Sequence, residues 1–499
     1  MPTAGSLVQL LYEGAALDPA AVAVETGDEA LTYAELMQRV ELAGASLQRL
    51  LPDPGSRIAL CAANHPQHLV AYLAILVSGF VWLPLNPANG RSLNSVIAQK
   101  AKPDLLLVDP ESVEHAPESD RSRLLDELRI EVPRFKPTYA SPDSVAAIKF
   151  TGGTSGEPKG VVQTHRNMLG VIENMQVFFE FGPDDCNLVV APLTHGSSHY
   201  VFPVLVAGGR HRFPRDRSSG SILAAMRDNT TVAFMPPTLI YKLLQQPGLS
   251  PGQFPALRHL TFSAAPMPPD RIVEAQRAFG PCISCLYGQT EAPMTISALG
   301  TGEMRDPSLL GTAGKACGSS RVRVVDDAGV EVPAGTIGNI EVTGPIVMQG
   351  YLDEPELTDA TVRDGWLRTG DLGFLDASGY LTLSGRASEV IITGGFNVYP
   401  AEIENVIAKI PGIRECCVYS VGDPYWGERI EAVVVRDANS AFAGADILQT
   451  VRQELGPVRT PKALHIVESL PRNAVGKVVR RDMPEFIESL QEQSDVQSV

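Results

Sequence analysis

The first half of the chain alternates short apolar runs with segments of helical periodicity. Each apolar run is followed by a turn and then by a helix-like stretch, such as residues 237–246. Parallel strands need a long crossover connection, usually a helix, so this alternation predicts an α/β fold with parallel-rich sheets. The strands expected from the apolar runs lie at 57–61, 104–108, 187–190 and 231–235.

The stretch 68–85 is apolar over about the length of one membrane span. Ser78, Gly79 and Pro84 interrupt it, which is typical of a buried helix, a glycine break and a short strand at 80–83. We therefore expect no integral membrane span.

The second half of the chain has a different pattern. From about Val322, strand-like runs and turns replace the alternation, which predicts a small β subdomain closing the large one. After Gly385 the pattern becomes that of a compact α+β segment. We expect a large N-terminal domain at 1–386 and a small C-terminal domain at 387–499. The helices and strands expected in the latter lie at 401–409, 415–421, 429–436 and 445–455.

Composition narrows the class of protein. The 499 residues are 44% hydrophobic and 20% charged, which is ordinary for a globular protein. The net charge of −16 disfavours a nucleic-acid partner. Seven scattered cysteines, an odd number, favour a reducing compartment, and the N-terminus lacks a signal-peptide pattern, so we expect a cytoplasmic protein. The oligomeric state stays open, with a homodimer as one alternative.

Residues 150–160 form the most informative segment, Phe-Thr-Gly-Gly-Thr-Ser-Gly-Glu-Pro-Lys-Gly, after an apolar run at 144–150. Glycines let backbone N–H groups turn toward a ligand and hydroxyls add donors, so the segment suits an anion such as a polyphosphate. It is not a P-loop, because Pro158 precedes Lys159 and Gly160 follows it. Taken alone, such a segment is more often a mobile surface loop rich in turn residues.

Four further motifs follow in a fixed order. They are Tyr-Gly-Gln-Thr-Glu at 287–291, Trp-Leu-Arg-Thr-Gly-Asp-Leu-Gly at 366–373, the run from Gly-Arg-Ala-Ser to Ala-Glu-Ile-Glu at 385–404, and Leu-Pro-Arg-Asn-Ala-Val-Gly-Lys at 470–477. With the segment 150–160, they resemble the adenylate-forming superfamily of acyl-CoA synthetases, adenylation domains and luciferases. The resemblance covers nearly the whole chain.

The resemblance implies a site where a carboxylate attacks the α-phosphate of ATP, which gives acyl-AMP and pyrophosphate. Two anions must be brought together, so the site needs positive charge and N–H donors. The implied ATP-binding residues are Thr151, Gly152, Thr154, Ser155, Gly156 and Lys159 at the phosphates, Tyr287, Ala264, Ala265 and Pro266 at the adenine, and Asp371 and Arg386 at the ribose.

The implied catalytic groups come from two of the motifs. Lys477 would bridge the carboxylate and the α-phosphate, Thr290 would bond the α-phosphate, and Glu291 would hold Mg²⁺. The plain alternatives are a solvated carboxylate for Glu291, a structural salt bridge for Asp371 and Arg386, and a solvated basic surface for Lys477.

A second half-reaction with coenzyme A is implied by further residues. Gly394 and Gly395 would line the pantetheine tunnel, Trp426 would stack on the CoA adenine, and Lys462 would meet its 3′-phosphate. Packing of Trp426 and solvation of Lys462 are the alternatives. The hinge position is Ser388, where the family usually has Asp or Lys.

The acid pocket is expected to be apolar. The stretch 192–198 has no aspartate to meet an amino acid's ammonium group, and Leu286 stands where malonate-type relatives have an arginine. An aryl, alicyclic or aliphatic monocarboxylate therefore fits. The pocket residues implied are His195, also the gate toward the CoA channel, Gly196, Ser263, Leu286, Gly288 and Met294.

The function expected from these residues is that of an ATP- and Mg²⁺-dependent acyl-CoA ligase. One alternative is a stand-alone acyl-AMP ligase that loads a carrier protein. Another is a non-catalytic nucleotide-binding regulator, which would have lost Lys477, Glu291 or Asp371, whereas all three are present. The sequence does not identify the acid.

Overall fold

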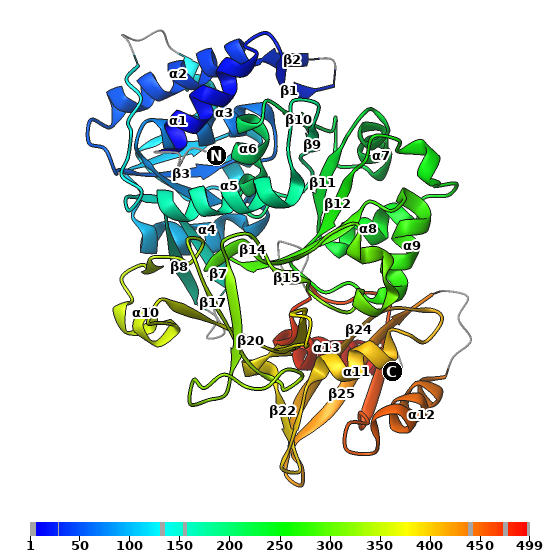
Figure 1. The fold of residues 1–499 in the computed structure, drawn as a ribbon. Coiled ribbons are helices and arrows are strands. Elements are labelled where there is room, and N and C mark those ends of the chain that lie inside the picture. The colour runs from blue at the N-terminus through cyan, green and yellow to red at the C-terminus, as the bar shows by residue number, and fades with distance from the viewer. Residues whose placement is uncertain are drawn as a thin grey trace.

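The computed structural model describes residues 6–27, 29–129, 135–152, 157–437, 443–472 and 478–496. Two large sheets with their helices form the upper body of the molecule, and two smaller sheets lie below them (Figure 1). The parallel-rich α/β fold class and the small β subdomain are confirmed.

A seven-stranded sheet carries the anion-binding segment. Its order is β18-β8-β7-β4-β3-β5-β6. The β18–β8 and β8–β7 pairs are antiparallel, and the remaining pairs are parallel. The strands are β3 (Arg57–Cys61), β4 (Val81–Leu85), β5 (Leu105–Val108), β6 (Ser122–Leu124), β7 (Val145–Gly152), β8 (Pro158–Thr164) and β18 (Gly350–Tyr351).

Strands β3, β4 and β5 are buried on both faces, which explains why they are almost continuously apolar. Successive residues of a strand point to opposite faces. In β3, Ile58 and Leu60 pack with α3 (Pro66–Val77), whereas Ala59 and Cys61 join the cluster that includes Ile97 of α4 (Gly90–Ala101).

Pro84 does not end its strand, contrary to the prediction that it interrupts the apolar run. It pairs with Leu60 inside β4. Toward β7, the described part of β4 pairs through Trp82 and Ala147, two residues before Pro84. The N–H that Pro84 lacks is therefore not needed for hydrogen bonds to β7. The predicted helix, glycine break and strand over 68–85 are otherwise present as α3, Gly79 and β4.

A nine-stranded sheet forms the second half of the large body, in the order β15-β14-β13-β12-β11-β9-β10-β1-β2. Its centre is parallel and both edges are antiparallel. The strands are β1 (Val22–Thr26), β2 (Glu29–Thr32), β9 (Cys186–Leu188), β10 (Arg210–Phe213), β11 (Val232–Met235), β12 (His259–Phe262), β13 (Ile283–Gln289), β14 (Ala292–Leu299) and β15 (Lys315–Ala316).

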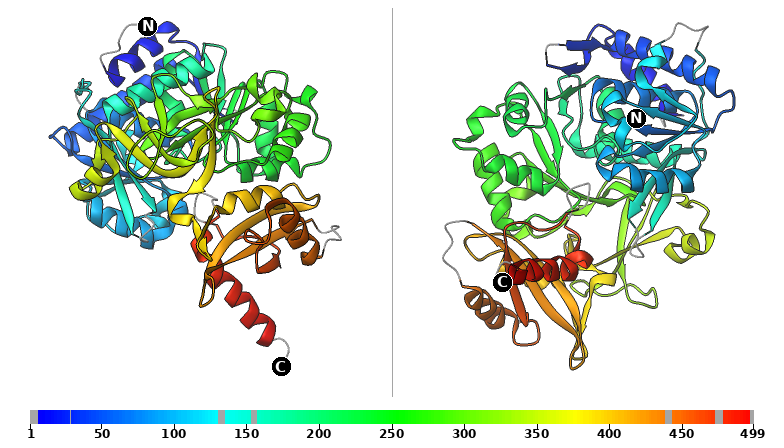
Figure 2. Two further views of the ribbon diagram at one scale, coloured as in Figure 1. Left: turned by 60° about the horizontal axis from the view of Figure 1, so that its bottom comes forward. Right: turned by 180° about the vertical axis from the view of Figure 1, so that it is seen from behind.

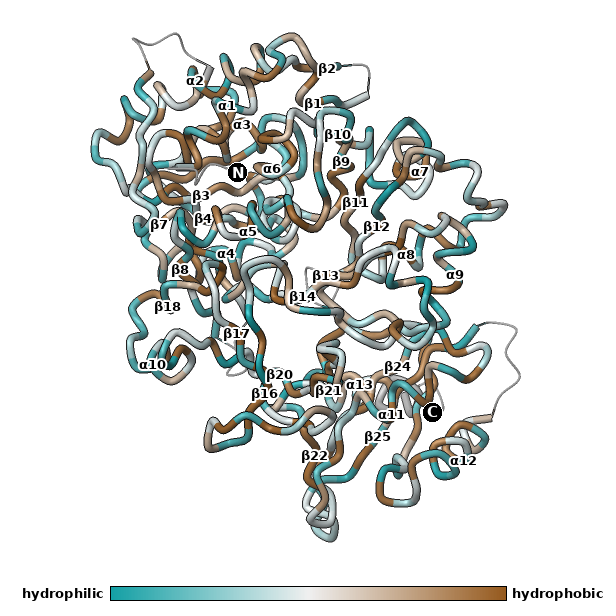
Figure 3. Tube along the Cα trace, viewed as in Figure 1, coloured by the Kyte–Doolittle hydropathy of each residue, from teal (hydrophilic) through white to brown (hydrophobic). Residues whose placement is uncertain are grey.

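Helices fill both faces of the second sheet. On the inner face, α5 (His165–Phe179) contacts β8 of the first sheet and β14 of the second, so it lies between the two sheets (Figure 1). Hydrophobic residues concentrate on the central strands such as β11, whose four residues are all buried (Figure 3). The remaining helices of the large body are α1 (Leu7–Leu17), α2 (Tyr33–Leu50), α6 (Ser198–Val206), α7 (Ser219–Arg227), α8 (Pro237–Leu244), α9 (Pro269–Phe279) and α10 (Pro355–Thr361).

Two five-stranded sheets complete the chain. The first has the order β16-β17-β20-β19, with β21 paired to β20, and the second has the order β23-β22-β25-β24, with β26 paired to β25. The strands are β16 (Arg321–Val325), β17 (Gly338–Thr343), β19 (Val362–Arg363), β20 (Trp366–Leu375), β21 (Leu381–Arg386), β22 (Ile391–Thr393), β23 (Phe396–Val398), β24 (Ile413–Asp423), β25 (Gly427–Arg436) and β26 (Ala463–Val467).

The last sheet carries the C-terminal helices. They are α11 (Pro400–Ile407), α12 (Gly444–Leu455) and α13 (Met483–Val496). Met483 and Ile487 anchor the start of α13 on Tyr419 and Val433, and the helix then extends away from the sheet (Figure 2, left). Strand β21 ends at Arg386, but the domain boundary after that residue stays a prediction. In the part of the chain that is described, no helix is long and apolar enough to cross a bilayer.

Candidate active site

The two arms of the anion-binding segment lie side by side. Thr151 on β7 and Lys159 on β8 are cross-strand partners, and Gly152 pairs with Pro158. The predicted ligands Thr154, Ser155 and Gly156 lie outside the described residues. The base of the predicted phosphate-binding segment is therefore a strand pair that fixes Thr151 beside Lys159.

A tight turn presents Thr290 and Glu291. Gln289 of β13 pairs with Ala292 of β14, so the two residues form the whole connection between these strands. The Gln163 side chain donates to the Thr290 carbonyl at 2.8 Å. Tyr351 donates from its hydroxyl to Glu291 Oε1 at 2.9 Å. The turn is thus held to the first sheet through β8 and β18.

Asp371 lies between a guanidinium and a phenol. Its backbone pairs with that of Arg386 across β20 and β21, and Arg386 Nε lies 2.7 Å from Asp371 Oδ1. Tyr287 donates to Asp371 Oδ2 at 2.5 Å. Burial, and then the Asp371 charge, raises the pKa of Tyr287 well above its ordinary value, so the phenol stays protonated. The structure thereby joins three of the residues predicted for adenine and ribose.

Arg386 connects this cluster with the Glu291 turn. Its charge acts on both Tyr287 and Tyr351 and opposes the rise of the pKa of each. The predicted ribose residues and the predicted metal-binding carboxylate are therefore neighbours in space, although Glu291 and Asp371 are far apart in sequence.

The predicted adenine wall, Ala264, Ala265 and Pro266, follows the carboxyl end of β12, where ligands bind in open α/β sheets. Ala264 has a φ of +71°, and Met294, in the predicted acid pocket, has a φ of +59°. Left-handed backbone is costly for residues other than glycine and persists only where surrounding structure enforces it.

The predicted acid-pocket residues Gly196, Gly288 and Met294 meet one another. A Cβ on Gly288 would lie 2.4 Å from the Met294 nitrogen. A Cβ on Gly196 would lie 2.6 Å from the Phe234 ring and 3.5 Å from Met294 Sδ. Both glycines are thus required by close approach. Leu286 and Ser263 are buried on the neighbouring strand ends.

His195 belongs to a buried polar group that includes Lys149, Ser198 and His199. Burial, and then the Lys149 charge, lowers the pKa of His195 to about 4, so its ring is neutral near pH 7. Lys149 Nζ donates to Ser198 Oγ at 3.1 Å and lies 2.9 Å from His199 Nε2, and Ser198 Oγ in turn donates to the His195 carbonyl at 2.7 Å. Lys149 therefore ties strand β7 to the turn that carries His195.

Three of the predicted CoA-binding residues also come together. Gly394 donates its N–H to the Trp426 carbonyl at 2.8 Å, and a Cβ on it would lie 3.1 Å from the Trp426 ring. Lys462 Nζ lies 5.0 Å from the centre of that ring. Gly394 and Gly395 have φ values of +56° and +83° in the turn between β22 and β23, as a two-residue hairpin turn requires. Ser388 is exposed.

The predicted catalytic Lys477 lies outside the described residues. The residues that flank this segment, Arg472 and Val478, form an antiparallel bridge. Arg480, which follows, binds Glu404 of α11 at 2.6 Å and Glu389, next to Ser388, at 3.1 Å. The chain just after Lys477 is thus anchored to both α11 and the predicted hinge region.

The donor set around Glu291 suits Mg²⁺. Among the described residues, no three His, Cys, Asp or Glu side chains gather to form an all-protein metal site. Mg²⁺ is commonly held by one or two carboxylates together with substrate phosphates. A single carboxylate beside a predicted phosphate segment fits that pattern.

Three residues near the site were absent from the sequence prediction. Lys149 is a lone charge inside an apolar strand, which was an available signal. Phe234 lies at the carboxyl end of a predicted parallel strand, a weaker signal. Tyr351 lies outside all five sequence motifs, and its contact with Glu291 joins segments 60 residues apart. No local pattern could therefore have indicated it.

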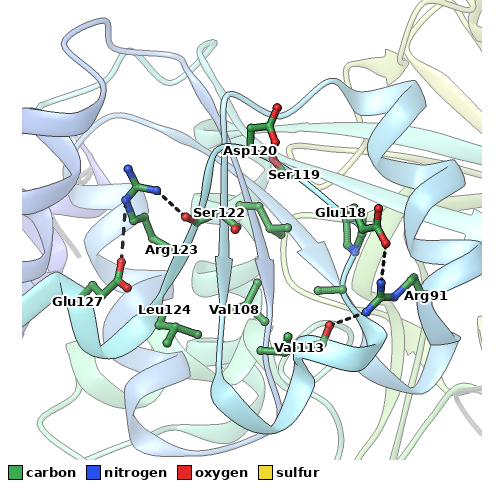
Figure 4. Close-up of a pocket in the computed structure, with 13 residues that line it drawn as sticks. Arg91, Val108, Val113, Glu118, Ser119, Asp120, Ser122, Arg123, Leu124 and Glu127 are labelled. Carbon is green, nitrogen blue, oxygen red and sulfur yellow. Dashed lines mark hydrogen bonds and ion pairs between the residues drawn. The ribbon is translucent and has the colours of Figure 1, made fainter.

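A separate cavity of about 450 Å³ lies at the edge of the seven-stranded sheet, beside β6 (Figure 4). The ion pairs Arg91–Glu118 and Arg123–Glu127, at 3.0 and 3.9 Å, border it. Within the described chain its lining comes from residues 91–127, so it is distinct from the predicted site.

Known proteins resemble this chain over nearly its whole length. Residues 11–352 match the family model described as AMP-binding enzyme, and residues 402–477 match that of the AMP-binding enzyme C-terminal domain. A feruloyl-CoA synthase from Amycolatopsis sp is 32% identical, covering 94% of this chain and 96% of its own. A medium/long-chain-fatty-acid–CoA ligase from Mycobacterium tuberculosis is 30% identical, covering 90% and 85%. The structure of ATP-bound MatB from Rhodopseudomonas palustris has a TM-score of 0.88 at 31% identity, covering 96% and 99%.

The buried Lys149 predicts a specific pH dependence of stability. Burial lowers its pKa from 10.5 to about 7, so the unfolded chain binds more protons than the folded one between these values. The free energy of unfolding should therefore rise with pH in this window, by at most about 1.4 kcal/mol per pH unit. Lys149→Met removes this contribution, so the wild type should gain stability relative to the variant as the pH rises from about 7 to 10.

Urea unfolding of both proteins across this pH range measures the difference. Lys242→Met, at an exposed lysine of α8, is the matched control and should differ from the wild type by a constant amount. A pH-independent difference for Lys149→Met as well would contradict a depressed pKa at this position.

Proposed function

The chain belongs to the AMP-binding enzyme family of the adenylate-forming superfamily, and on that premise we propose that it is an ATP-dependent acyl-CoA ligase. A carboxylate oxygen attacks the α-phosphorus of ATP, and pyrophosphate leaves. The CoA thiol then loses its proton and attacks the acyl carbon, which gives acyl-CoA and releases AMP. The enzyme class is that of the AMP-forming acid–thiol ligases.

One observation carries the proposal for the ATP site. The cluster of Tyr287, Asp371 and Arg386 adjoins the Glu291 turn, which in turn lies beside the strand of Lys159. A carboxylate can accept hydrogen bonds from both ribose hydroxyls, and a lysine beside a glycine-rich segment can hold the departing pyrophosphate. In our proposal Asp371 takes the first role and Lys159 the second.

The remaining ATP contacts follow from position along the same edges. We assign the α-phosphate to Thr290, the β- and γ-phosphates to Thr151, Gly152, Thr154, Ser155 and Gly156, and the adenine faces to Tyr287 and the wall at 264–266. Glu291 would hold Mg²⁺, which when bound supplies positive charge against the triphosphate. Lys477 is assigned to the carboxylate and the α-phosphate, where charge develops.

A hydrophobic monocarboxylate is the proposed acid. Gly196 faces the Phe234 ring and Met294 Sδ, and Phe234, Leu286 and Met294 belong to one hydrophobic cluster. The neutral ring of His195 adds no charge beside them. The similar proteins from Amycolatopsis and Mycobacterium are named for a feruloyl and a fatty-acyl product, which agrees with an apolar pocket.

Coenzyme A is the proposed acceptor. Support comes from the contact of Gly394 and Lys462 with the half-buried indole of Trp426, which offers an aromatic face beside a cation. Gly395 would share the pantetheine tunnel with Gly394. The domains 1–386 and 387–499, with Ser388 as the hinge, would reorient between the two half-reactions.

The proposed location is a reducing compartment such as the cytoplasm, since all seven cysteines are free thiols.

The products of ATP test the reaction class. With ATP, a hydrophobic acid such as a fatty or aryl carboxylate, and CoA, the protein should form AMP and pyrophosphate in equal amounts. Chromatography of the nucleotides with a coupled pyrophosphate assay measures both. Formation of ADP and phosphate would contradict the proposal.

The acceptor test separates CoA from a carrier protein. Consumption of the acyl-adenylate should accelerate on addition of CoA, with acyl-CoA detected by mass spectrometry. A phosphopantetheinyl carrier protein should not substitute for it. Transfer to the carrier alone would instead favour the stand-alone acyl-AMP ligase.

Lys477→Ala should separate the two half-reactions. Loss of a charge that acts in the transition state costs on the order of 10²- to 10³-fold in rate, so pyrophosphate release should fall by about this factor. Thioester formation from supplied acyl-AMP should stay near the wild-type rate. Lys409→Ala, at an exposed lysine of the same domain, is the control. Equal loss in both assays would show that Lys477 is not specific to adenylation.

A further inference from the structure

Tyr351 lies between two side chains of opposite charge. Its hydroxyl donates to Glu291 Oε1 at 2.9 Å, and Lys159 Nζ lies 5.9 Å from the centre of its ring. Within the described part of the chain, no ion pair joins Lys159 to Glu291. A single tyrosine therefore holds an acid at its edge and a base over its face.

The backbone of Tyr351 is fixed beside both partners. Strand β18 lies beside β8 (Figure 3). Tyr351 is opposite Val161, and the Leu352 N–H donates to the Gly160 carbonyl at 2.7 Å. The Tyr351 N–H donates to Thr358 Oγ1 at 2.9 Å. Glu291 is fixed separately, because its carbonyl accepts from the Met348 N–H at 2.8 Å. The position of the ring between the two charges thus follows from the fold.

The two contacts of Tyr351 differ from an ion pair in one respect. A lysine and a glutamate in direct contact would neutralise each other, and each would have to leave the other before it met a ligand. A phenol donates to a carboxylate without cancelling its charge, and an aromatic face attracts an ammonium only weakly at 5.9 Å, near the limit of such contacts.

We propose that Tyr351 is a positioning residue that keeps Lys159 and Glu291 apart, so that Lys159 is free for phosphate and Glu291 for Mg²⁺. This inference rests on the proposed function, which assigns these two ligands. In the proposed reaction Tyr351 contacts neither the carboxylate oxygen nor the α-phosphorus. Its hydroxyl orients Glu291, and its ring prevents Lys159 from reaching that carboxylate.

A second triad with the same contacts provides a matched control. Tyr380 donates to Glu303 Oε1 at 2.9 Å, and Lys315 Nζ lies 4.3 Å from the centre of the Tyr380 ring. This triad joins β15 and the start of β21, away from the Glu291 turn. Removal of the Tyr380 hydroxyl therefore removes an equivalent contact without touching the proposed ligands.

The experiment measures binding, with no catalytic turnover. Isothermal titration of the full chain with α,β-methylene-ATP, in Mg²⁺ and in EDTA, gives the nucleotide affinity and its increase on addition of Mg²⁺. Tyr351→Phe loses the hydroxyl and keeps the ring. Loss of one hydrogen bond to a charged partner corresponds to about 10- to 100-fold, so the Mg²⁺-dependent increase should shrink by up to that factor while the affinity in EDTA stays unchanged. Tyr380→Phe should match the wild type in both conditions.

Tyr351→Leu should behave differently, because it also removes the ring. Lys159 and Glu291 can then pair, so affinity should fall in EDTA as well, by about 2- to 10-fold. Glu291→Gln in the Tyr351→Leu background frees Lys159, and the affinity in EDTA should recover. A tyrosine that only supports the fold would not give this recovery.

The outcomes distinguish the two levels of proposal. If the wild type binds the analogue with Mg²⁺ dependence but Tyr351→Phe equals the wild type, the role of Tyr351 is wrong and the function stands. No recovery in the double variant also overturns it. If the wild type does not bind the analogue at all, the proposed function itself fails. Circular dichroism confirms folding of each variant, and Tyr351→Phe keeps the test decisive if Tyr351→Leu does not fold.

Discussion

Acidic and basic side chains must lie a few ångströms apart at this site without all of them cancelling one another. Asp371 and Arg386 are allowed to meet, because their strands place them opposite each other and a phenol takes the second carboxylate oxygen. Glu291 and Lys159 are kept separate by a ring. The rest of the site is arranged around this ion pair and this separated pair. A triphosphate and a carboxylate can be bound only by charged side chains that do not already neutralise each other.

The side chains of the predicted site lie at or near the ends of strands in the two large sheets. The His195 turn, the wall at 264–266 and the Glu291 turn follow β9, β12 and β13 of one sheet, and Lys159 begins a strand of the other. Helix α5 lies between the two sheets and fixes their relation. Connections at the carboxyl ends of strands can vary while the strands stay packed, which is why such edges carry ligand sites.

Local sequence patterns could predict much of the fold because both periodicity and turn residues are local. The strand at 57–61 and the α3–β4 unit were read from apolar runs alone. Pro84 was misjudged because its effect depends on which neighbour a strand has at that point, and no single segment contains that information. The ATP-side residues were found through motifs, yet Tyr351, Phe234 and Lys149 act through contacts between distant segments. The roles of all the predicted site residues remain predictions, and Lys477, Thr154, Ser155 and Gly156 also lie outside the described residues.

The left-handed backbone at Met294 restricts which side chains can replace this methionine in the proposed acid pocket. A β-branched side chain is strongly disfavoured at such a position, so valine, isoleucine and threonine are poor replacements there. Gly196 and Gly288 are equally closed to larger residues by their close neighbours. In the proposed acid pocket, changes of side-chain size are therefore easier at Phe234 and Leu286, whose backbone is not left-handed, than at Met294, Gly196 or Gly288.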